Sequence, residues 1–262
     1  MVMIPDLQQK RFDPAPPPRT IVVRQYLPKD HAQIFAMLYE GFAFGSGSPG
    51  ETAVRQAMYT CPAFASYAIF LAGGILVFTV DPKLGLALCV AAILAILYLR
   101  NSTQRAFYAF CDTAWRTDMV DITAHYQISD GKALGPAGFW VAVIEGALPN
   151  GDDEVVGFLG MENLPTALAL GHLRRMVVSP RHRRKRIASL IIDAIVAHAR
   201  KHAPPVMVLE LETSAYQPAA HALYLKHGFE VISSRQMRMS ALHSVEVFRF
   251  RKPVWGAESL TV

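Results

Sequence analysis

The stretch that decides the fold of this chain is VVSPRHRRKRIA, residues 177–188. It starts at the end of a strand-like run over 172–178 and leads into apolar residues at helical spacing over 187–202. Between the two, residues 181–186 are all basic if the histidine is counted. The N–H groups at the start of a helix and the helix dipole bind anions, and guanidinium groups add charge-assisted hydrogen bonds. The stretch therefore predicts a strand–loop–helix unit that binds a multiply charged phosphate ligand, such as a dinucleotide, a polyphosphate or coenzyme A.

The same cluster accounts for the positive charge of the chain. The net charge is +5, and seven lysines and arginines, with no acid among them, fall within residues 174–186. Basic runs of this kind also occur as nuclear localisation signals, nucleic-acid patches or solvated surfaces. The position of the cluster between a strand and a helix favours the phosphate-ligand interpretation, so we expect no nucleic-acid partner.

Two apolar segments without charged residues form a second strong pattern. They are residues 63–80 and 84–99, and the tripeptide Asp-Pro-Lys at 81–83 separates them. At 1.5 Å per residue they extend about 27 and 24 Å, slightly less than a hydrocarbon core of about 30 Å. Because Asp-Pro favours a turn and proline suits the first turn of a helix, we predict a helical hairpin over 63–99. It either crosses a thin bilayer twice or enters and returns; a pair of buried core helices in a soluble protein is the alternative.

The composition and the flanking charges agree with a membrane protein. Hydrophobic residues make up 52% of the chain and charged residues 18%, against a usual charged share of about 25%. Arg55 precedes the hairpin and Arg100 and Arg105 follow it, so the positive-inside tendency places both of its ends on the cytosolic face. The three cysteines match no metal or redox motif, and the nine histidines form no zinc-type motif with a nearby carboxylate, so we expect no metal.

The rest of the chain alternates between strand and helix patterns. Residues 1–19 are rich in proline and are predicted to form a disordered tail, while 20–262 form one mixed α/β domain interrupted by the hairpin. Strands are expected over 21–26, 139–144, 155–161, 172–178, 206–212, 229–234 and 245–251. Helices are expected from Asp30 to the glycines at 41–50, over about 112–126, and over 187–202 and 218–226.

Two motifs resemble those of the GNAT acetyltransferase superfamily. Residues 178–188 are similar to its acetyl-CoA loop, which reads Val-x-Pro, then Arg or Gln, two residues, Gly, one residue, and Gly or Ala. Arg183 matches the Arg or Gln position. Residues 222–229, ALYLKHGF, are similar to the Leu-Tyr-x-x-x-Gly-Phe motif of the superfamily. The chain departs from the loop motif at Arg184 and Arg186, where glycine is usual, and these side chains crowd the approach of the backbone to a pyrophosphate.

Within this superfamily, the chain resembles one membrane-anchored branch, the aspartate and cysteine-conjugate N-acetyltransferases. It is carried by 173–178, 211–214 and 219–224, and by Arg24, Tyr26, Asp30 and Gly41 near the start. Proteins of this branch also have a hydrophobic membrane segment between their first helices, where this chain has 63–99. The resemblance covers about residues 20–251 and implies a GNAT fold with an inserted transmembrane or re-entrant hairpin.

What the resemblance implies for function is specific. The chain would be an N-acetyltransferase of the endoplasmic reticulum membrane, with its catalytic domain on the cytosolic face. Acetyl-CoA would be the co-substrate, and the acceptor would be a primary amine of an amino acid, an amino-acid conjugate or a protein lysine. Tyr224 would act as general acid near the coenzyme sulfur, with packing in the core as its alternative role. Coenzyme contacts are implied for Met176, Val177, Val178, Arg181, Arg183, Arg184, Lys185, Arg186, Ile187 and Ala188, the first three through their backbone.

Two further roles are expected from strand geometry. Glu210 and Glu212 share one face of a strand, because side chains alternate along it. A carboxylate near apolar surroundings can have a raised pKa, which suits it to accept the proton of an ammonium group. Of the two glutamates, Glu212 coincides with the motif of the cysteine-conjugate N-acetyltransferases, so the resemblance implies that Glu212 is the base; a structural carboxylate is the alternative role. Arg174 and Arg175 point to opposite faces of their strand, so one of them is expected to bind the carboxylate of the acceptor.

A different class of function stays open. A membrane protein with this fold but without catalytic activity would use the arginine-rich loop to bind anionic lipid headgroups. Arg184 and Arg186 favour this alternative, whereas Tyr224 and the Gly-Phe pair at 228–229 favour the enzyme. We expect an acyltransferase whose partners are an amine acceptor and membrane lipid.

Overall fold

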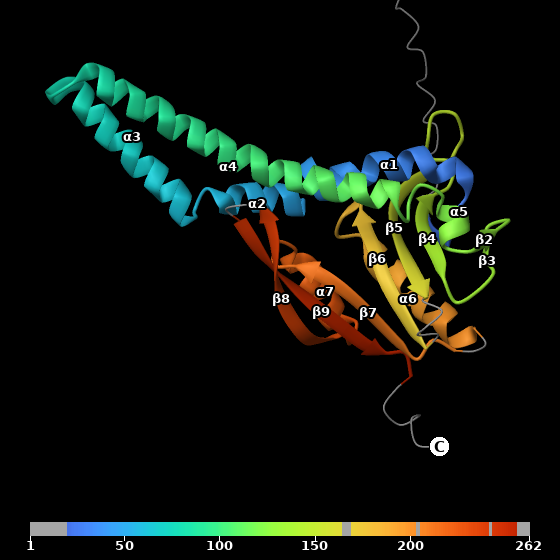
Figure 1. Cartoon of the computed structure of the whole chain (residues 1–262). Coiled ribbons are helices and arrows are strands. Elements are labelled where there is room, and N and C mark those ends of the chain that lie inside the picture. The colour runs from blue at the N-terminus through green and yellow to red at the C-terminus, as the bar shows by residue number, and fades with distance from the viewer. Residues whose placement is uncertain (1–19, 164–168, 203–204, 241–242, 256–262) are drawn as a thin grey trace, which may run out of the picture.

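The computed structural model describes residues 20–163, 169–202, 205–240 and 243–255, and Figure 1 shows how its helices and strands are arranged. The proline-rich tail predicted over 1–19 lies outside the described residues. The described chain folds into a mixed α/β domain from which one long helical hairpin projects. The expected mixed α/β class is therefore confirmed.

A seven-stranded sheet forms the middle of the domain, in the order β1-β4-β5-β6-β7-β9-β8. All neighbouring strands are antiparallel except β6 and β7, which run parallel. The strands are β1 Ile21–Gln25, β4 Gly138–Ile144, β5 Glu154–Asn163, β6 Leu170–Val178, β7 Val208–Ser214, β8 Glu230–Ser240 and β9 His243–Pro253. A separate ribbon consists of β2 Ile128–Ser129 and β3 Lys132–Ala133. Each predicted strand of the large sheet is present, although β8 and β9 extend further than expected.

The helices include one that the sequence did not predict. They are α1 His31–Tyr39, α2 Pro49–Ala57, α3 Cys61–Thr79, α4 Pro82–Arg116, α5 Ile122–His125, α6 Ile187–Lys201 and α7 Pro218–Lys226, with short helices η1 Pro28–Asp30, η2 Glu40–Phe44 and η3 Pro180–His182. The unpredicted helix is α2, because its glycine-rich start was interpreted only as the end of α1. Ser48 begins it by accepting a hydrogen bond from the backbone N–H of Glu51 at 3.1 Å, and Pro49 suits its first position.

Both faces of the sheet are covered, which explains why every residue of β4 is buried. Alternate residues of β4 belong to two different hydrophobic clusters. Val141 packs in a cluster with Leu38 of α1 and with residues of α4. Its neighbour Ala142 packs in the other cluster with Ile191 of α6. The domain therefore has one core on each side of the sheet.

The sheet opens between β6 and β7. Their parallel pairing ends at Leu173 and Leu211, although both strands continue beyond these residues. Just past this point β6 has a bulge, where its register with β5 shifts between Phe158 and Gly160 and Arg175 adopts a φ of 62°. A left-handed conformation costs a non-glycine residue about 1–2 kcal/mol, so other contacts must hold Arg175 in place.

The turn of the hairpin forms as expected. α3 ends at Thr79 and α4 begins at Pro82. Asp81 caps α4, because its side chain accepts hydrogen bonds from the backbone N–H groups of Lys83 at 2.9 Å and Leu84 at 3.3 Å. The acidic residue of the predicted turn therefore defines the start of the second helix.

The second helix of the hairpin is longer than predicted. It does not end near residue 99 but continues to Arg116, and the helix expected over 112–126 is its last turn followed by the short α5. The reason is a change in the burial pattern along one continuous helix. Beyond the apolar segment, Thr103, Phe107 and Cys111 are buried at four-residue spacing and face the domain.

The two hairpin helices touch through small residues. A Cβ placed on Gly73 would lie 2.8 Å from the carbonyl oxygen of Gly85 and 2.9 Å from the sulfur of Cys89. Both glycines thus permit a close approach of the backbones, as is common where apolar helices pack in a membrane.

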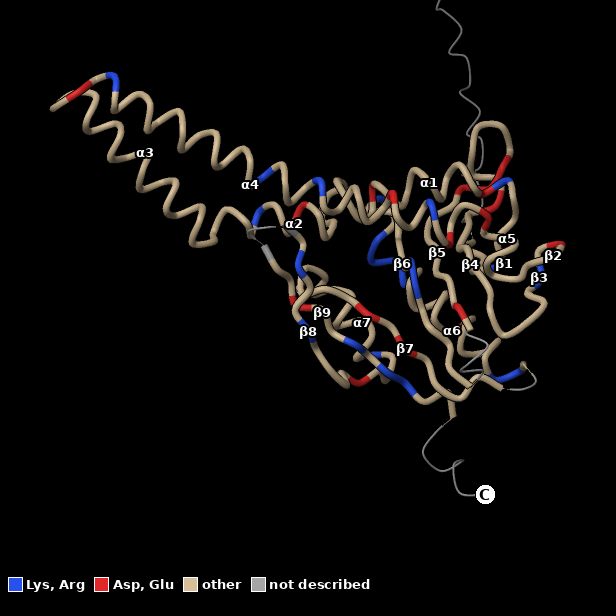
Figure 2. The backbone as a smooth tube through the Cα atoms, viewed as in Figure 1, with Lys and Arg blue, Asp and Glu red and all other residues tan. Residues whose placement is uncertain are grey.

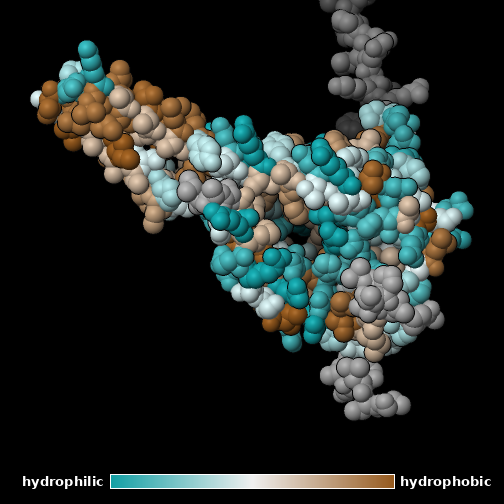
Figure 3. Space-filling model, in the orientation of Figure 1, coloured by the Kyte–Doolittle hydropathy of each residue, from teal (hydrophilic) through white to brown (hydrophobic). Residues whose placement is uncertain are grey.

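The outward surface of the hairpin is apolar (Figure 3). Phe78 is 90% exposed and Leu71 is 66% exposed, whereas the charged residues Asp81 and Lys83 are at the tip (Figure 2). Within the part of the chain that the structure describes, α3 and α4 are long and apolar enough to cross a membrane. Their apolar windows are only 17% buried, so the alternative of buried core helices does not fit the structure.

We expect Gly73→Leu to destabilise the hairpin by about 1–3 kcal/mol, because the larger side chain meets the backbone of α4. Gly74 is a matched control, since nothing lies within 4 Å of a Cβ placed there. Thermal unfolding of the full-length protein in detergent should show a lower midpoint for Gly73→Leu and an unchanged midpoint for Gly74→Leu. Equal midpoints for the two variants would contradict the described packing.

Candidate functional site

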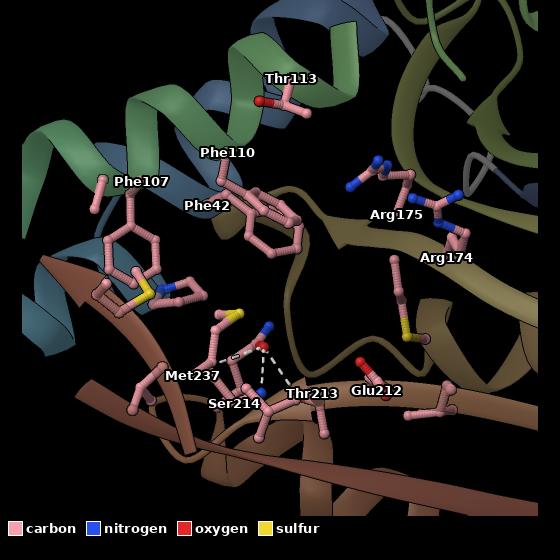
Figure 4. Close-up of a pocket in the computed structure, with 18 of the residues that line it drawn as sticks. Phe42, Phe107, Phe110, Thr113, Arg174, Arg175, Glu212, Thr213, Ser214 and Met237 are labelled. Carbon is pink, nitrogen blue, oxygen red and sulfur yellow. Dashed lines mark hydrogen bonds between the residues drawn. The ribbon is translucent and has the colours of Figure 1, made fainter. Parts of the chain in front are cut away.

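A cavity of about 540 Å³ lies where β6 and β7 diverge, between the sheet and α4 (Figure 4). Cavities of this size are typical of small-molecule sites. Residues that line it include His172, Arg174, Arg175 and Met176 of β6; Leu211, Glu212, Thr213 and Ser214 of β7; Phe107, Phe110 and Thr113 of α4; Tyr224 of α7; and Arg235 and Met237 of β8. Residues distant in sequence thus meet at the opening of the sheet.

The open edge of β6 offers hydrogen-bond donors to the cavity. Successive N–H groups along a strand point to opposite edges, and the N–H of Ser179 donates to the carbonyl of Val156 in β5 at 3.0 Å. The N–H groups of Met176 and Val178 therefore point toward the gap left by β7, and that of Val177 points toward β5. Of the three residues predicted to contact the coenzyme through the backbone, the geometry favours Met176 and Val178, while Val177 is buried in the core.

Tyr224 places a hydroxyl at this opening. The side chain is 5% exposed, and its hydroxyl donates to the sulfur of Met176 at 3.1 Å. Its ring packs against Phe229 and Phe250, so the expected packing role is also present. Burial raises the pKa of Tyr224 well above its usual value, which keeps the hydroxyl protonated at neutral pH. The group can therefore donate a proton or a hydrogen bond into the cavity.

The end of α7 explains the Leu-Tyr-x-x-x-Gly-Phe motif. Gly228 has a φ of 77°, a conformation that glycine adopts without strain. The N–H of Gly228 donates to the carbonyl of Leu225, and the N–H of Phe229 donates to that of Tyr224, both at 3.0 Å. This helix end turns the chain back, so that the ring of Phe229 lies 5.6 Å from that of Tyr224 and fixes its orientation.

The strained Arg175 is held by a buried ion pair. Its Nε and Nη2 donate to the two carboxylate oxygens of Asp118 at 2.9 and 2.6 Å. The hydroxyls of Tyr126 and Thr117 donate to the same carboxylate, each at 2.9 Å. Burial alone would raise the pKa of Asp118, but the hydrogen bonds and charge of Arg175 outweigh it and lower the pKa to about 2. The guanidinium also lies 5.1 Å from the centre of the Phe110 ring.

These contacts bear on the role expected for the arginines of β6. Arg175 is paired with Asp118, and the expectation that one of the two arginines binds an acceptor carboxylate stays a prediction. Arg174 donates to Glu162 at 2.6 Å, and the same carboxylate oxygen contacts His125 at 2.8 Å. The sequence did not reveal Asp118, because 57 positions separate it from Arg175 and no local pattern relates the two.

Glu212 lines the cavity but does not have the apolar surroundings that were expected. Arg235 donates to its carboxylate at 2.8 Å and Arg249 at 3.0 Å. Burial would raise the pKa of Glu212, but these two arginines outweigh burial and hold the pKa below its usual value. The expectation of a raised pKa is therefore wrong. Glu210 shares the same face, as predicted, and pairs with Arg251 of β9.

His172 lines the cavity, although the sequence did not single it out as a site residue. It lies in β6 opposite Glu210 of β7. Burial, followed by the charge of Arg174, lowers its pKa. The imidazole is therefore neutral at neutral pH, and a neutral imidazole nitrogen can accept a proton. Among the described residues, no group of three or more His, Cys, Asp or Glu is arranged to hold a metal, and the expectation of no metal stays a prediction.

The basic loop keeps the backbone shape of a glycine-containing loop. Arg184 has a φ of 66° and Arg186 a φ of 60°, so both positions where glycine is usual are left-handed. Each arginine bears a cost of about 1–2 kcal/mol there. No side chain caps the start of α6, so the N–H groups of its first turn are available to an anion. Arg184, Lys185 and Arg186 are exposed beside them, and together these groups fit a phosphate-bearing ligand.

Two side chains attach this loop to the rest of the domain. Arg183 donates to the carbonyl of Ser46 at 2.8 Å, between α1 and α2. His182 contacts the carboxylate of Glu154 at 3.1 Å. Arg183, which was expected to bind the coenzyme, therefore positions the loop in this structure.

The acetyltransferase (GNAT) family matches residues 97–229, which is half of the chain. This segment contains the diverging strands, the basic loop and Tyr224. The chain belongs to the GNAT acetyltransferase family. The resemblance inferred from two short motifs is thus confirmed.

The chain is also similar to curated proteins of known name. N-acetyltransferase 8F1 of Rattus norvegicus is 31% identical over 147 residues, 55% of this chain and 60% of the relative. N-acetylaspartate synthetase of Mus musculus is 28% identical over 215 residues, 82% of this chain and 64% of the relative. The chain thus spans less than two thirds of the length of these curated relatives. A solved GNAT-family acetyltransferase of Staphylococcus aureus covers 90% of this chain and 100% of its own, at 12% identity and a TM-score of 0.48.

We expect Asp118→Asn to destabilise the GNAT domain by about 3–5 kcal/mol, because it leaves the buried guanidinium of Arg175 without its carboxylate. The pKa of Asp118 is lower in the folded than in the unfolded chain. Its ion pair therefore stabilises the fold above about pH 4, and this contribution is lost as the pH falls toward about 2. Denaturant unfolding of both proteins should show a stability difference that shrinks over this range. Asp152→Asn, in an exposed turn, is the control and should have little effect. A difference that does not change with pH would contradict the assigned pKa.

Proposed function

We propose that this GNAT protein transfers an acetyl group from acetyl-CoA to a primary amine, by direct attack of the amine. The observation that carries the proposal is the protonated hydroxyl of Tyr224, held in the cavity where β6 and β7 diverge. The same strand leads directly into the basic loop and α6, which offer sites for phosphate groups. Candidate acceptors are an amino acid, an amino-acid conjugate and a protein lysine, which share a primary amino group. The name N-acetylaspartate synthetase of one relative supports an amino-acid acceptor.

Acetyl-CoA supplies an activated acetyl thioester, and we propose how this chain holds it. The backbone of Ile187 and Ala188, at the start of α6, binds the pyrophosphate. Exposed basic side chains around it add charge; these are Arg181, Arg184, Lys185 and Arg186. The N–H groups of Met176 and Val178 face the pantetheine arm along the open edge of β6. Arg183 keeps the loop in position through Ser46.

Two residues of the cavity are suited to move protons. Amide formation joins nitrogen to the acetyl carbon and releases the sulfur, so an ammonium acceptor loses two protons and the thiol gains one. His172 is neutral and accepts the first proton. Tyr224 donates its proton to the sulfur, and the second proton of the nitrogen replaces it. Glu212 is less suited as a base, because two arginines hold its pKa low and bind its carboxylate.

We propose further that the hairpin inserts into a bilayer with both of its ends on the cytosolic face, in the endoplasmic reticulum. The exposed apolar surface of α3 and α4 supports insertion. Arg55, Arg100 and Arg105 near the base of the hairpin support the orientation. Release of the protein from cell membranes by alkaline carbonate would contradict insertion.

Calorimetry with purified full-length protein should show saturable binding of acetyl-CoA, and addition of an amine should release free coenzyme A. Tyr224→Phe is expected to keep this binding but to lower turnover about 100-fold, because the ring still packs while the proton donor is lost. Tyr39→Phe removes a hydroxyl bound to Asp112 at the exposed surface and should leave turnover unchanged. Absence of binding by folded protein would overturn the proposal and favour lipid binding by the arginine-rich loop.

The pH profile tests the role of His172. Because its pKa in the folded protein lies below about 6.5, kcat/KM should stay high at neutral pH and fall only below that value. His172→Gln should lose this acid limb and lower kcat/KM about 100-fold. His31→Gln alters a histidine that contacts Tyr26 outside the cavity and should keep the wild-type profile. An acid limb that persists in His172→Gln would assign the base to another group.

A further inference from the structure

The α4 residues that line the cavity are apolar except for Thr113. Figure 4 shows Phe107 and Phe110 of α4 on one side and Met237 of β8 on the other. Further apolar residues complete this lining; they are Phe42, Ala106, Ala109, Met239, Val245 and Val247. They come from η2, α4 and the β8–β9 pair, so tertiary packing alone brings them together. A ligand that fills this side of the cavity buries its body against hydrocarbon.

The positive charges around the cavity already have partners. Three of the arginines that line it hold a carboxylate: Arg174 holds Glu162, Arg175 holds Asp118, and Arg235 holds Glu212. An acceptor carboxylate placed here would have to compete with these carboxylates for the arginines, and two of the existing pairs are buried or half-buried. Desolvating a charge without a partner is costly, so the lining disfavours an acidic acceptor.

One continuous helix connects this lining to the apolar hairpin. The outer part of α4 exposes Leu86, Leu94 and other large apolar side chains, and the inner part gives Phe107 and Phe110 to the cavity. Arg100 lies between the two parts of the helix. With the hairpin inserted as proposed above, an apolar molecule dissolved in the bilayer is concentrated beside the helix that forms the cavity wall.

We propose that the acceptor is a primary amine carried on an apolar aliphatic or aromatic body without a carboxylate. The proposal rests on the proposed acetyl transfer and names the class of its acceptor. The amino group reaches His172 and Tyr224 at the opening of the sheet, and the hydrocarbon body lies against α4 and β8. The acceptors that the sequence resemblance implied are amino-acid amines or protein lysines, and the apolar lining with its paired arginines favours a different chemistry.

A matched set of acceptors tests this with the full-length protein in lipid nanodiscs and acetyl-CoA. Phenylethylamine and phenylalanine share an aromatic body and differ by one carboxylate; octylamine and aspartate extend the comparison. Release of coenzyme A, with the product identified by its mass, gives kcat/KM for each amine. We expect phenylethylamine and octylamine to exceed phenylalanine and aspartate by at least about ten-fold, as expected when a carboxylate must be buried without a partner.

A pair of variants on one strand tests where the apolar body lies. Met237→Gln keeps the size of the side chain but makes the wall polar, and it should raise KM for octylamine several-fold without changing the affinity for acetyl-CoA. Val231→Gln places the same polar group at an exposed position of β8 outside the cavity and should leave KM unchanged. Equal KM values for the two variants would overturn the assigned position.

The outcomes separate the two proposals. Faster acetylation of aspartate or phenylalanine would overturn the apolar acceptor while leaving acetyl transfer established. Acetylation of none of the four amines by protein that binds acetyl-CoA would overturn the apolar acceptor alone, whereas absence of acetyl-CoA binding would overturn the proposed function. Preference for the two amines without a carboxylate, together with a raised KM for octylamine in Met237→Gln and an unchanged KM in Val231→Gln, would support the apolar acceptor.

Discussion

Arg175 and Asp118 form the interaction on which the site depends. The bulge in β6 requires Arg175 to adopt a left-handed conformation that is unfavourable for a side chain with a Cβ. Two hydrogen bonds to Asp118, itself bound by Tyr126 and Thr117, hold the residue there. The bulge lies where β6 ceases to pair with β7, and the separation of these strands opens the cavity. A buried ion pair thus maintains an opening that regular sheet pairing would close.

This ion pair also links the sheet to the hairpin. Asp118 follows α4 by two residues, and Phe110 of the same helix lies against the guanidinium of Arg175. The outer and inner parts of α4 therefore have different surroundings. Its outer part presents apolar side chains to the surroundings, and its inner part packs on the sheet and lines the cavity. Because the helix is continuous, the orientation of the hairpin and the position of the cavity wall are set together.

The arginine-rich loop shows how tertiary structure imposes a backbone conformation on residues that do not favour it. Arg184 and Arg186 occupy left-handed positions that glycine would adopt without strain. The loop is held at both of its ends, by the pairing of Val178 in β6 and by the buried side chain of Ile187 in α6. Arg183 adds a contact to Ser46. The conformation is retained, and the extra positive charge lies beside the uncapped start of the helix.

Local patterns in the sequence predicted most of the elements. Strand alternation located the strands of the large sheet, and helical spacing located α6 and α7. The apolar segments and the Asp-Pro turn located the hairpin. The failures have physical causes. α2 was missed because the glycines near its start were interpreted as the end of α1. The predicted end of α4 came too early, because the burial pattern changes where the helix leaves the apolar segment and packs on the domain, although the helix itself continues.

The candidate site likewise has features that the sequence predicted and features that it did not. The sequence by itself determined the basic loop and the tyrosine with its Gly-Phe helix end, because these depend on neighbouring residues and on hydrogen bonds within one turn. Only the tertiary structure decided which partners the charged side chains bind. Arg175 pairs with Asp118 and Glu212 with Arg249, residues 57 and 37 positions apart, so neither partner can be found from local spacing. The pKa of a buried group depends on its partners, and the partners of these groups are set by how strands and helices pack.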